Sequence, residues 1–153
     1  MEVPTATSLD QIYPGEALST QKRRWQNLLS QFKTTYDRPA DFVSRSPGRV
    51  NLIGEHIDYS LYEVIPMAVT ADVLLAVSVN ARKDGPSRVR IANVDSKFPT
   101  REFEIPSEGE IKIDASSHEW TNYFKSGLLG ASQLLAKNKN KGDRFAPVGM
   151  DIL

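Results

Sequence analysis

Apolar residues recur at helical spacing in two stretches of the chain. In residues 18–36 they fall on one stripe of a helix, and Pro39 follows, which biases the residue before it away from helical angles. The second stretch runs over 120–137, directly after the string SSHE at 116–119, which matches a capping box. We therefore expect two amphipathic helices, the second beginning near Ser116.

Between these helices the apolar residues follow the two-residue alternation, or the continuous β-branched runs, that are typical of strands. The strings SPG at 46–48 and KDGP at 83–86 predict turns. We expect strands at 42–45, 49–53, 64–67, 72–79, 88–94, 101–105 and 145–153, with a loop over 107–117. Strands and helices thus alternate, but the pattern does not determine the order of the strands in a sheet.

Composition limits the classes of protein that fit. The 153 residues, 40% of them hydrophobic and 25% charged, suit one globular domain or a piece of a larger one. Equal numbers of basic and acidic residues, 19 of each, argue against a general nucleic-acid or anionic-membrane binder. The chain has no run near the ~20 apolar residues of a membrane span, an acidic and polar start unlike a secretory signal, and no cysteine. We expect a cytoplasmic protein without disulfides.

The densest polar cluster is GRVNLIGEHIDY, residues 48–59. Arg49 opens an apolar strand that ends at Gly54, and Glu55, His56 and Asp58 follow within four positions. Carboxylates accept hydrogen bonds, guanidinium donates them and imidazole does either, which is the set that sugar hydroxyls require. Three other interpretations stay open on the pattern alone: a zinc site, a solvated charged turn and an internally satisfied polar network.

The string SPGRVNLIGEHIDY, at 46–59, closely resembles the galactokinase signature of the GHMP kinase superfamily. The resemblance continues through the helix at 18–36, EVIPMAVTADVLLAVS at 63–78 and EWTNYFKSGLLG at 119–130. It implies an α+β fold: an incomplete N-terminal GHMP-kinase-type domain over 17–153, after an N-terminal arm at 1–16. Such a domain has a mixed, mostly antiparallel sheet, and we expect its helices on one face.

The resemblance also implies an activity, the ATP-dependent phosphorylation of galactose to galactose 1-phosphate with Mg²⁺, and a set of site residues. Family contacts to galactose fall on Arg49, Glu55, His56 and Asp58, with the arginine also stabilising the transferring phosphoryl group. Trp120 and Tyr123 would flank the adenine of ATP, although aromatic residues at this spacing are also typical of a core. No resident metal ligand is expected.

Some features leave alternatives open. Ile57 and Ser60 stand where many family members have Thr and Asn, so an N-acetylgalactosamine kinase remains an alternative. A non-catalytic galactose and ATP sensor that binds a regulatory protein would carry the same signature. The chain ends inside an apolar strand, and the family's phosphate loop and catalytic aspartate are expected beyond Leu153. We therefore expect the 153-residue chain to be inactive by itself.

Overall fold

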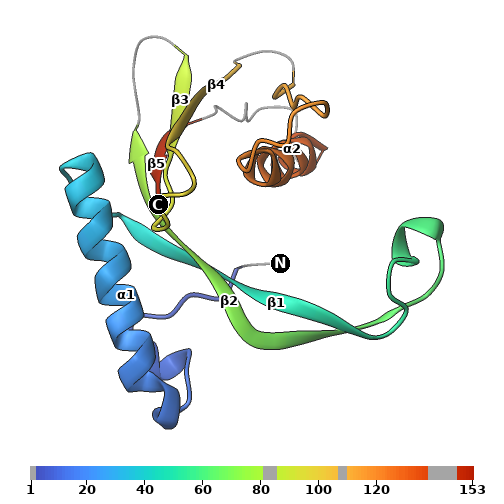
Figure 1. The fold of residues 1–153 in the computed structure, drawn as a ribbon, viewed down its shortest axis with the longest axis horizontal. Helices are drawn as coiled ribbons and strands as arrows, with labels where there is room; N and C mark the ends of the chain where they lie inside the picture. The colour runs from blue at the N-terminus through green and yellow to red at the C-terminus, as the bar shows by residue number, and fades with distance from the viewer. Residues whose placement is uncertain (1–2, 81–85, 107–109, 138–147) are drawn as a thin grey trace.

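The computed structural model describes residues 3–80, 86–106, 110–137 and 148–153, which form one five-stranded sheet and two α-helices (Figure 1). The sheet order is β1-β2-β5-β3-β4; β3 and β5 are parallel, and the other neighbours are antiparallel. This confirms the α+β class and the mixed, mostly antiparallel sheet. The elements are α1 (Gly15–Tyr36), β1 (Phe42–Ile53), β2 (Ile65–Asn80), β3 (Ser87–Ile91), β4 (Arg101–Ile105), α2 (Asn122–Lys137) and β5 (Gly149–Ile152), with short 3₁₀ helices at Leu9–Gln11 and Asp58–Ser60.

The two helices cover opposite faces of the sheet (Figure 1), so the expectation that they share one face is wrong. Successive side chains of a strand point to opposite faces. In β2, Leu74 and Ala76 pack in the cluster that contains α1, whereas Leu75 and Val77 pack in the cluster that contains α2. The apolar run of β2 is therefore covered on both sides, which explains why it lacks polar alternation.

The core under α1 is centred on Phe32, which is fully buried. Its ring lies 4.9 Å from the ring of Tyr36, centroid to centroid. The Tyr36 hydroxyl donates a hydrogen bond of 2.7 Å to the carbonyl of Ile152 in β5, the central strand of the sheet. Burial, aided by the Asp151 carboxylate, raises the pKa of Tyr36 to about 12. α1 is thus attached to the middle of the sheet by both apolar and polar contacts.

Strands β1 and β2 are each continuous, so the predicted turn at 46–48 and the predicted gap at 68–71 are wrong. Pro47 fits in the strand because β1 is at the edge of the sheet, where a missing N–H leaves no partner unpaired. The pairing register shifts between Pro47 and Arg49, as at a β-bulge. The proline and glycine therefore mark a bend in a long hairpin rather than a reversal of the chain.

The second helix begins at Asn122, and the predicted capping box does not form. The Ser116 hydroxyl is hydrogen-bonded to the carboxylate of Asp114 at 2.6 Å. Glu119 instead accepts two hydrogen bonds from Arg101 of β4, at 2.8 and 3.0 Å. Glu119, which the local pattern assigned to the helix start, therefore forms a long-range ion pair with Arg101 instead.

Some predicted elements cannot be compared in full. Residues 83–85 of the predicted turn, 107–109 of the predicted loop and 145–147 of the predicted strand lie outside the described residues. Neither of the described α-helices is both long and apolar enough to traverse a bilayer.

Candidate functional site

The polar cluster of the sequence lies at the end of a long hairpin. Strands β1 and β2 run together past the body of the sheet and are joined by residues 54–64 (Figure 1). We call residues 48–71 the distal hairpin; none of them is buried. Many of its apolar side chains are exposed, including Val50, Leu52, Ile53, Ile65 and Met67. The cluster is therefore displayed on an open surface.

The backbone at the tip of the distal hairpin is tightly folded. Gly54 has φ 92°, a conformation that residues with a Cβ rarely adopt, and its carbonyl accepts a hydrogen bond of 2.7 Å from Asn51 Nδ2. A Cβ at Gly54 would lie only 2.6 Å from Cγ1 of Val64. His56 and Leu61 also have positive φ, at 55° and 66°. Such strain is common at binding sites, where the chain holds side chains in position for a ligand.

Replacing Gly54 by alanine is expected to destabilise the hairpin tip. The positive φ and the contact with Val64 together should cost about 1–3 kcal/mol, since left-handed backbone costs a residue with a Cβ roughly 1–2 kcal/mol. Gly127→Ala is the matched control, because a Cβ at Gly127 meets nothing within 4 Å and alanine favours a helix by roughly 1 kcal/mol. The urea concentration at the unfolding midpoint should be higher for Gly127→Ala than for wild type and lower for Gly54→Ala. An unchanged midpoint for Gly54→Ala would contradict this prediction.

The structure brings the four predicted sugar-binding residues onto this tip. Nη1 of Arg49 and Oδ2 of Asp58 form an ion pair of 3.5 Å in which both side chains are about half exposed. The His56 ring lies 6.4 Å from the ring of Tyr59. Glu55 is exposed and its side chain has no hydrogen bond or ion pair among the described residues. A guanidinium, an imidazole and two carboxylates thus face solvent together, ready to donate to and accept from hydroxyl groups.

The alternative of a zinc site receives no geometric support. Within residues 3–80, 86–106, 110–137 and 148–153, no three His, Asp or Glu side chains converge as a metal site would require. Asp58 is paired with Arg49 instead of facing the imidazole of His56 in a common ligand set.

The two predicted nucleotide contacts have different environments. Trp120 packs against the cluster beneath α2, with its ring 5.9 Å from that of Phe98, and its indole N–H donates to the carbonyl of Pro99 at 3.1 Å. This matches the core role that the sequence left open for it. Tyr123, in the first turn of α2, is 88% exposed and presents a free aromatic face. Contact of either ring with adenine stays a prediction.

Comparison with known proteins connects this hairpin to a family. Residues 30–79 match the family model of the galactokinase galactose-binding signature. The chain is 47% identical to the galactokinase of Saccharomyces cerevisiae over 112 residues, which are 72% of this chain and 21% of that protein. Residues 30–79 thus carry the galactose-binding signature of galactokinases, and most of the chain is similar in sequence to galactokinases of fungi. Galactokinases of Candida parapsilosis (46% identity, 81% of this chain, 24% of that protein) and Dictyostelium discoideum (40%, 85% and 25%) are similarly related.

The chain thus spans about a quarter of the length of these galactokinases. The match of the family model covers α1 from Ser30 onward, all of β1, the tip and most of β2. Among the described residues, the galactokinase signature therefore corresponds to one structural unit, the β1–β2 hairpin with the end of α1.

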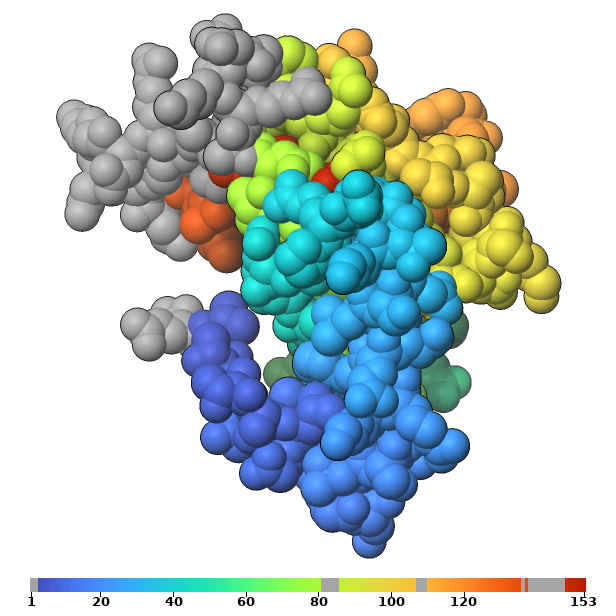
Figure 2. Space-filling model, turned by 90° about the vertical axis from the view of Figure 1, so that its left-hand side faces the viewer, coloured from blue at the N-terminus to red at the C-terminus, as the bar shows by residue number. Residues whose placement is uncertain are grey.

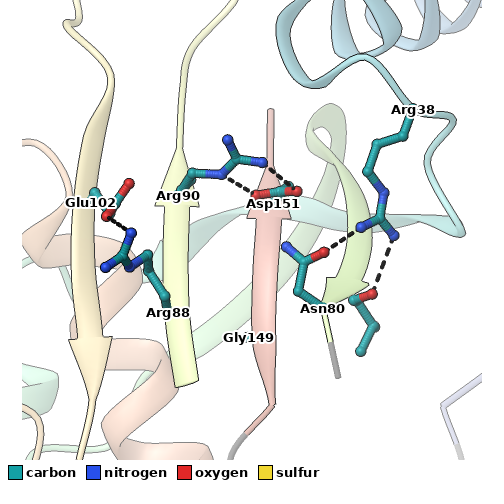
Figure 3. A pocket seen from close by; sticks show the side chains of 8 residues that line it. Arg38, Asn80, Arg88, Arg90, Glu102, Gly149 and Asp151 are labelled. Atoms are coloured by element: carbon teal, nitrogen blue, oxygen red, sulfur yellow. Dashed lines mark hydrogen bonds and ion pairs between the residues drawn. The ribbon is translucent and has the colours of Figure 1, made fainter. Parts of the chain in front are cut away.

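A separate cavity of about 530 Å³ lies on the α1 face of the sheet, away from the distal hairpin (Figure 3). Four of its five charged side chains form ion pairs with one another. Arg90 donates two hydrogen bonds to Asp151, at 2.6 and 2.8 Å, and Arg88 pairs with Glu102 at 2.8 Å. Burial raises the pKa of Asp151, but its hydrogen bonds with Arg90 outweigh this and hold the pKa below the usual range. We interpret the side chains that line this cavity as a structural ion-pair network.

Sequence reasoning missed two buried carboxylates, Asp72 in β2 and Asp151 in β5. Asp72 stands near the start of the apolar run ADVLLAV, and Asp151 stands inside the apolar run GMDIL. An aspartate in such a run must be paired if it is buried, since an unpaired buried charge is very costly. The apolar runs therefore indicate that each aspartate needs a partner if it is buried. They do not identify the partners, which lie tens of residues away in the sequence.

Proposed function

We propose that the protein to which this sequence belongs is a galactokinase, which transfers a phosphoryl group from ATP to the 1-hydroxyl of galactose. The observation that carries the proposal is the tip of the distal hairpin, where Arg49, Glu55, His56 and Asp58 gather inside the matched galactose-binding signature. The names of the fungal relatives favour this enzyme over a non-catalytic sensor.

Each of the four side chains has a role that its chemistry supports. Glu55 and Asp58 accept hydrogen bonds from sugar hydroxyls, and His56 accepts or donates one according to its protonation state. Arg49 lies beside Asp58, which orients the guanidinium, and it stabilises negative charge on the phosphoryl group in transit. Because the group that accepts the hydroxyl proton is not among these four, we assign no general base in this chain.

ATP and Mg²⁺ belong to the same proposal. The exposed ring of Tyr123 offers a face on which a nucleobase can stack, and Trp120 supports the start of the same helix. The described residues contain no group of three His, Asp or Glu side chains for a divalent ion, so no step is assigned to the metal here. A cytoplasmic location is proposed with this function, since ATP and sugar phosphates are intracellular metabolites.

Asp58→Asn tests the proposed function. A chimera in which this chain replaces the corresponding part of the Saccharomyces cerevisiae galactokinase is expected to phosphorylate galactose. Loss of a hydrogen bond to a charged group costs about 1.5–3 kcal/mol, so Asp58→Asn should lower kcat/KM for galactose roughly 10- to 100-fold.

The control for this assay is Asp10→Asn, an exposed carboxylate in the 3₁₀ helix before α1, which should leave kcat/KM unchanged. Coupled measurement of ADP release, with melting temperatures for both variants, separates lost binding from lost folding. A folded Asp58→Asn chimera with wild-type kcat/KM would refute the assignment of the tip as the galactose site.

A further inference from the structure

Among the described residues, Asp72 is a buried carboxylate that receives several side-chain donors. Its side chain is completely buried and receives donors from three different parts of the chain. The Tyr13 hydroxyl donates to Oδ2 at 2.9 Å, Arg24 donates to Oδ1, and Nε of Arg45 donates to Oδ2. These hydrogen bonds outweigh the effect of burial, so the pKa of Asp72 lies below its ordinary value.

The donors tie separate elements together. Arg24 belongs to α1 and also donates to the backbone carbonyl of Asp72, while Arg45 belongs to β1 and lies 4.9 Å above the ring of Tyr13. Tyr13 follows the first 3₁₀ helix and accepts a hydrogen bond of 3.2 Å from the indole of Trp25. Seen from the side of α1, the N-terminal residues lie next to the lower part of that helix (Figure 2). Asp72 therefore joins the N-terminal segment, α1 and both strands of the hairpin.

Asp72 also stands at the base of the distal hairpin. It pairs with Pro47, the last residue before the register shift in β1, and beyond this pair no residue as far as the tip is buried. A two-stranded ribbon without cover twists readily. The direction of the distal hairpin is thus set where it leaves the body of the protein, at the Asp72 contacts.

The distance from base to tip makes this direction matter. About seven residues separate Pro47 from Gly54, which corresponds to roughly 23 Å of extended strand. A rotation of about 10° at the base would move the tip by roughly 4 Å over that length. Binding and catalytic groups must be held to about 0.5 Å, so a small change at Asp72 would misplace the turn that begins at Gly54 relative to Arg49, which lies only two residues beyond Pro47.

We propose that Asp72 is a positioning residue for the galactose site: held by Tyr13, Arg24 and Arg45, it fixes the angle at which the distal hairpin leaves the sheet. The role of this angle in placing a sugar-binding site rests on the proposed function. The fixed angle between the distal hairpin and the sheet rests only on contacts among the described residues.

The test measures the angle directly. Because the chain has no cysteine, Gln26→Cys in α1 and Ser60→Cys at the tip provide two sites for spin labels. Pulsed electron paramagnetic resonance should give one narrow distance for the otherwise unchanged chain. In Asp72→Asn, the distance should shift, or its distribution broaden, by about 4 Å or more, the displacement estimated for a 10° rotation. Tyr13→Phe, which removes one donor and keeps the ring, should produce a smaller change in the same direction.

Asp41→Asn is the matched control, since Asp41 accepts a hydrogen bond from the Val79 amide at the other end of the strands. It should leave the label distance unchanged. Circular dichroism identifies variants that remain folded; if Asp72→Asn unfolds, Tyr13→Phe decides. An unchanged distance in the folded variant overturns the proposal, because a network that only stabilises the fold would alter melting and leave the tip in place.

Galactose titration followed by NMR completes the test. A shifted distance with unchanged galactose affinity would overturn the positioning role. If the unaltered chain shows no galactose binding while Asp72→Asn still moves the hairpin, the fixed angle is supported and the proposed function is what has failed.

Discussion

Phe32→Ala is expected to destabilise the chain by about 3–5 kcal/mol, the range for truncating a buried aromatic side chain. Phe32 has no exposed surface and lies between α1 and β2, with Tyr36 and Leu28 on its own helix. Its removal opens a cavity beneath the one helix that covers this face of the sheet in the described part of the chain. Whole domains are stable by only about 5–15 kcal/mol, so much of the folding free energy would be lost.

Urea unfolding followed by tryptophan fluorescence measures this loss, because Trp25 packs against the same cluster. Leu29→Ala is the matched control: it lies on the same helix but is 40% exposed, so it should cost less than half as much. Equal losses for the two variants would show that the α1 contact with the sheet contributes little to stability.

Asp151→Asn should lower the free energy of unfolding by about 2 kcal/mol at neutral pH. The variant keeps the shape of the side chain but removes the charge that receives two hydrogen bonds from Arg90. Breaking a fully buried pair costs about 3–5 kcal/mol. We expect less here because the Arg90 side chain is 42% exposed and water can solvate part of its charge. Glu102→Gln, in the exposed pair with Arg88, is the control and should cost under about 1 kcal/mol.

The lowered pKa of Asp151 predicts that the stability difference between wild type and Asp151→Asn depends on pH. The folded protein holds the pKa of Asp151 below the ordinary value of 3.8, so the ionised carboxylate stabilises the fold at every pH above that value. This contribution is lost as the pH falls through the lowered pKa. The stability difference between wild type and Asp151→Asn should therefore be constant from pH 7 to about 5 and shrink below pH 4. A difference that grew on acidification would contradict the assigned direction.

The elements of the fold were largely predictable from local pattern. Helical spacing in 18–36 and alternation in 101–105 led to α1 and β4, since these periods follow from how side chains project from each backbone. The predicted turn at 46–48 failed because SPG permits both a reversal and an edge-strand bulge, and only pairing with β2 selects between them.

The candidate site was predictable for a related reason. Its residues Arg49, Glu55, His56 and Asp58 lie within ten positions, so one strand and one turn suffice to bring them together. By contrast, the partners of Asp72 lie 27, 48 and 59 residues away, and Arg90 and Asp151 are 61 apart. No local period relates residues at those separations.

The sequence by itself therefore determined the helices, most of the strands and the group of polar residues at the hairpin tip, because these depend on neighbours along the chain; the α+β class came from its resemblance to the GHMP kinases. The tertiary structure alone decided that α1 and α2 take opposite faces, that Glu119 pairs with Arg101 instead of capping α2, and that Asp72 holds the base of the hairpin. Those outcomes depend on contacts between residues that are far apart in the sequence. Strand pairing decides which of these residues come close enough to interact. A buried carboxylate is stable only where such pairing supplies its donors.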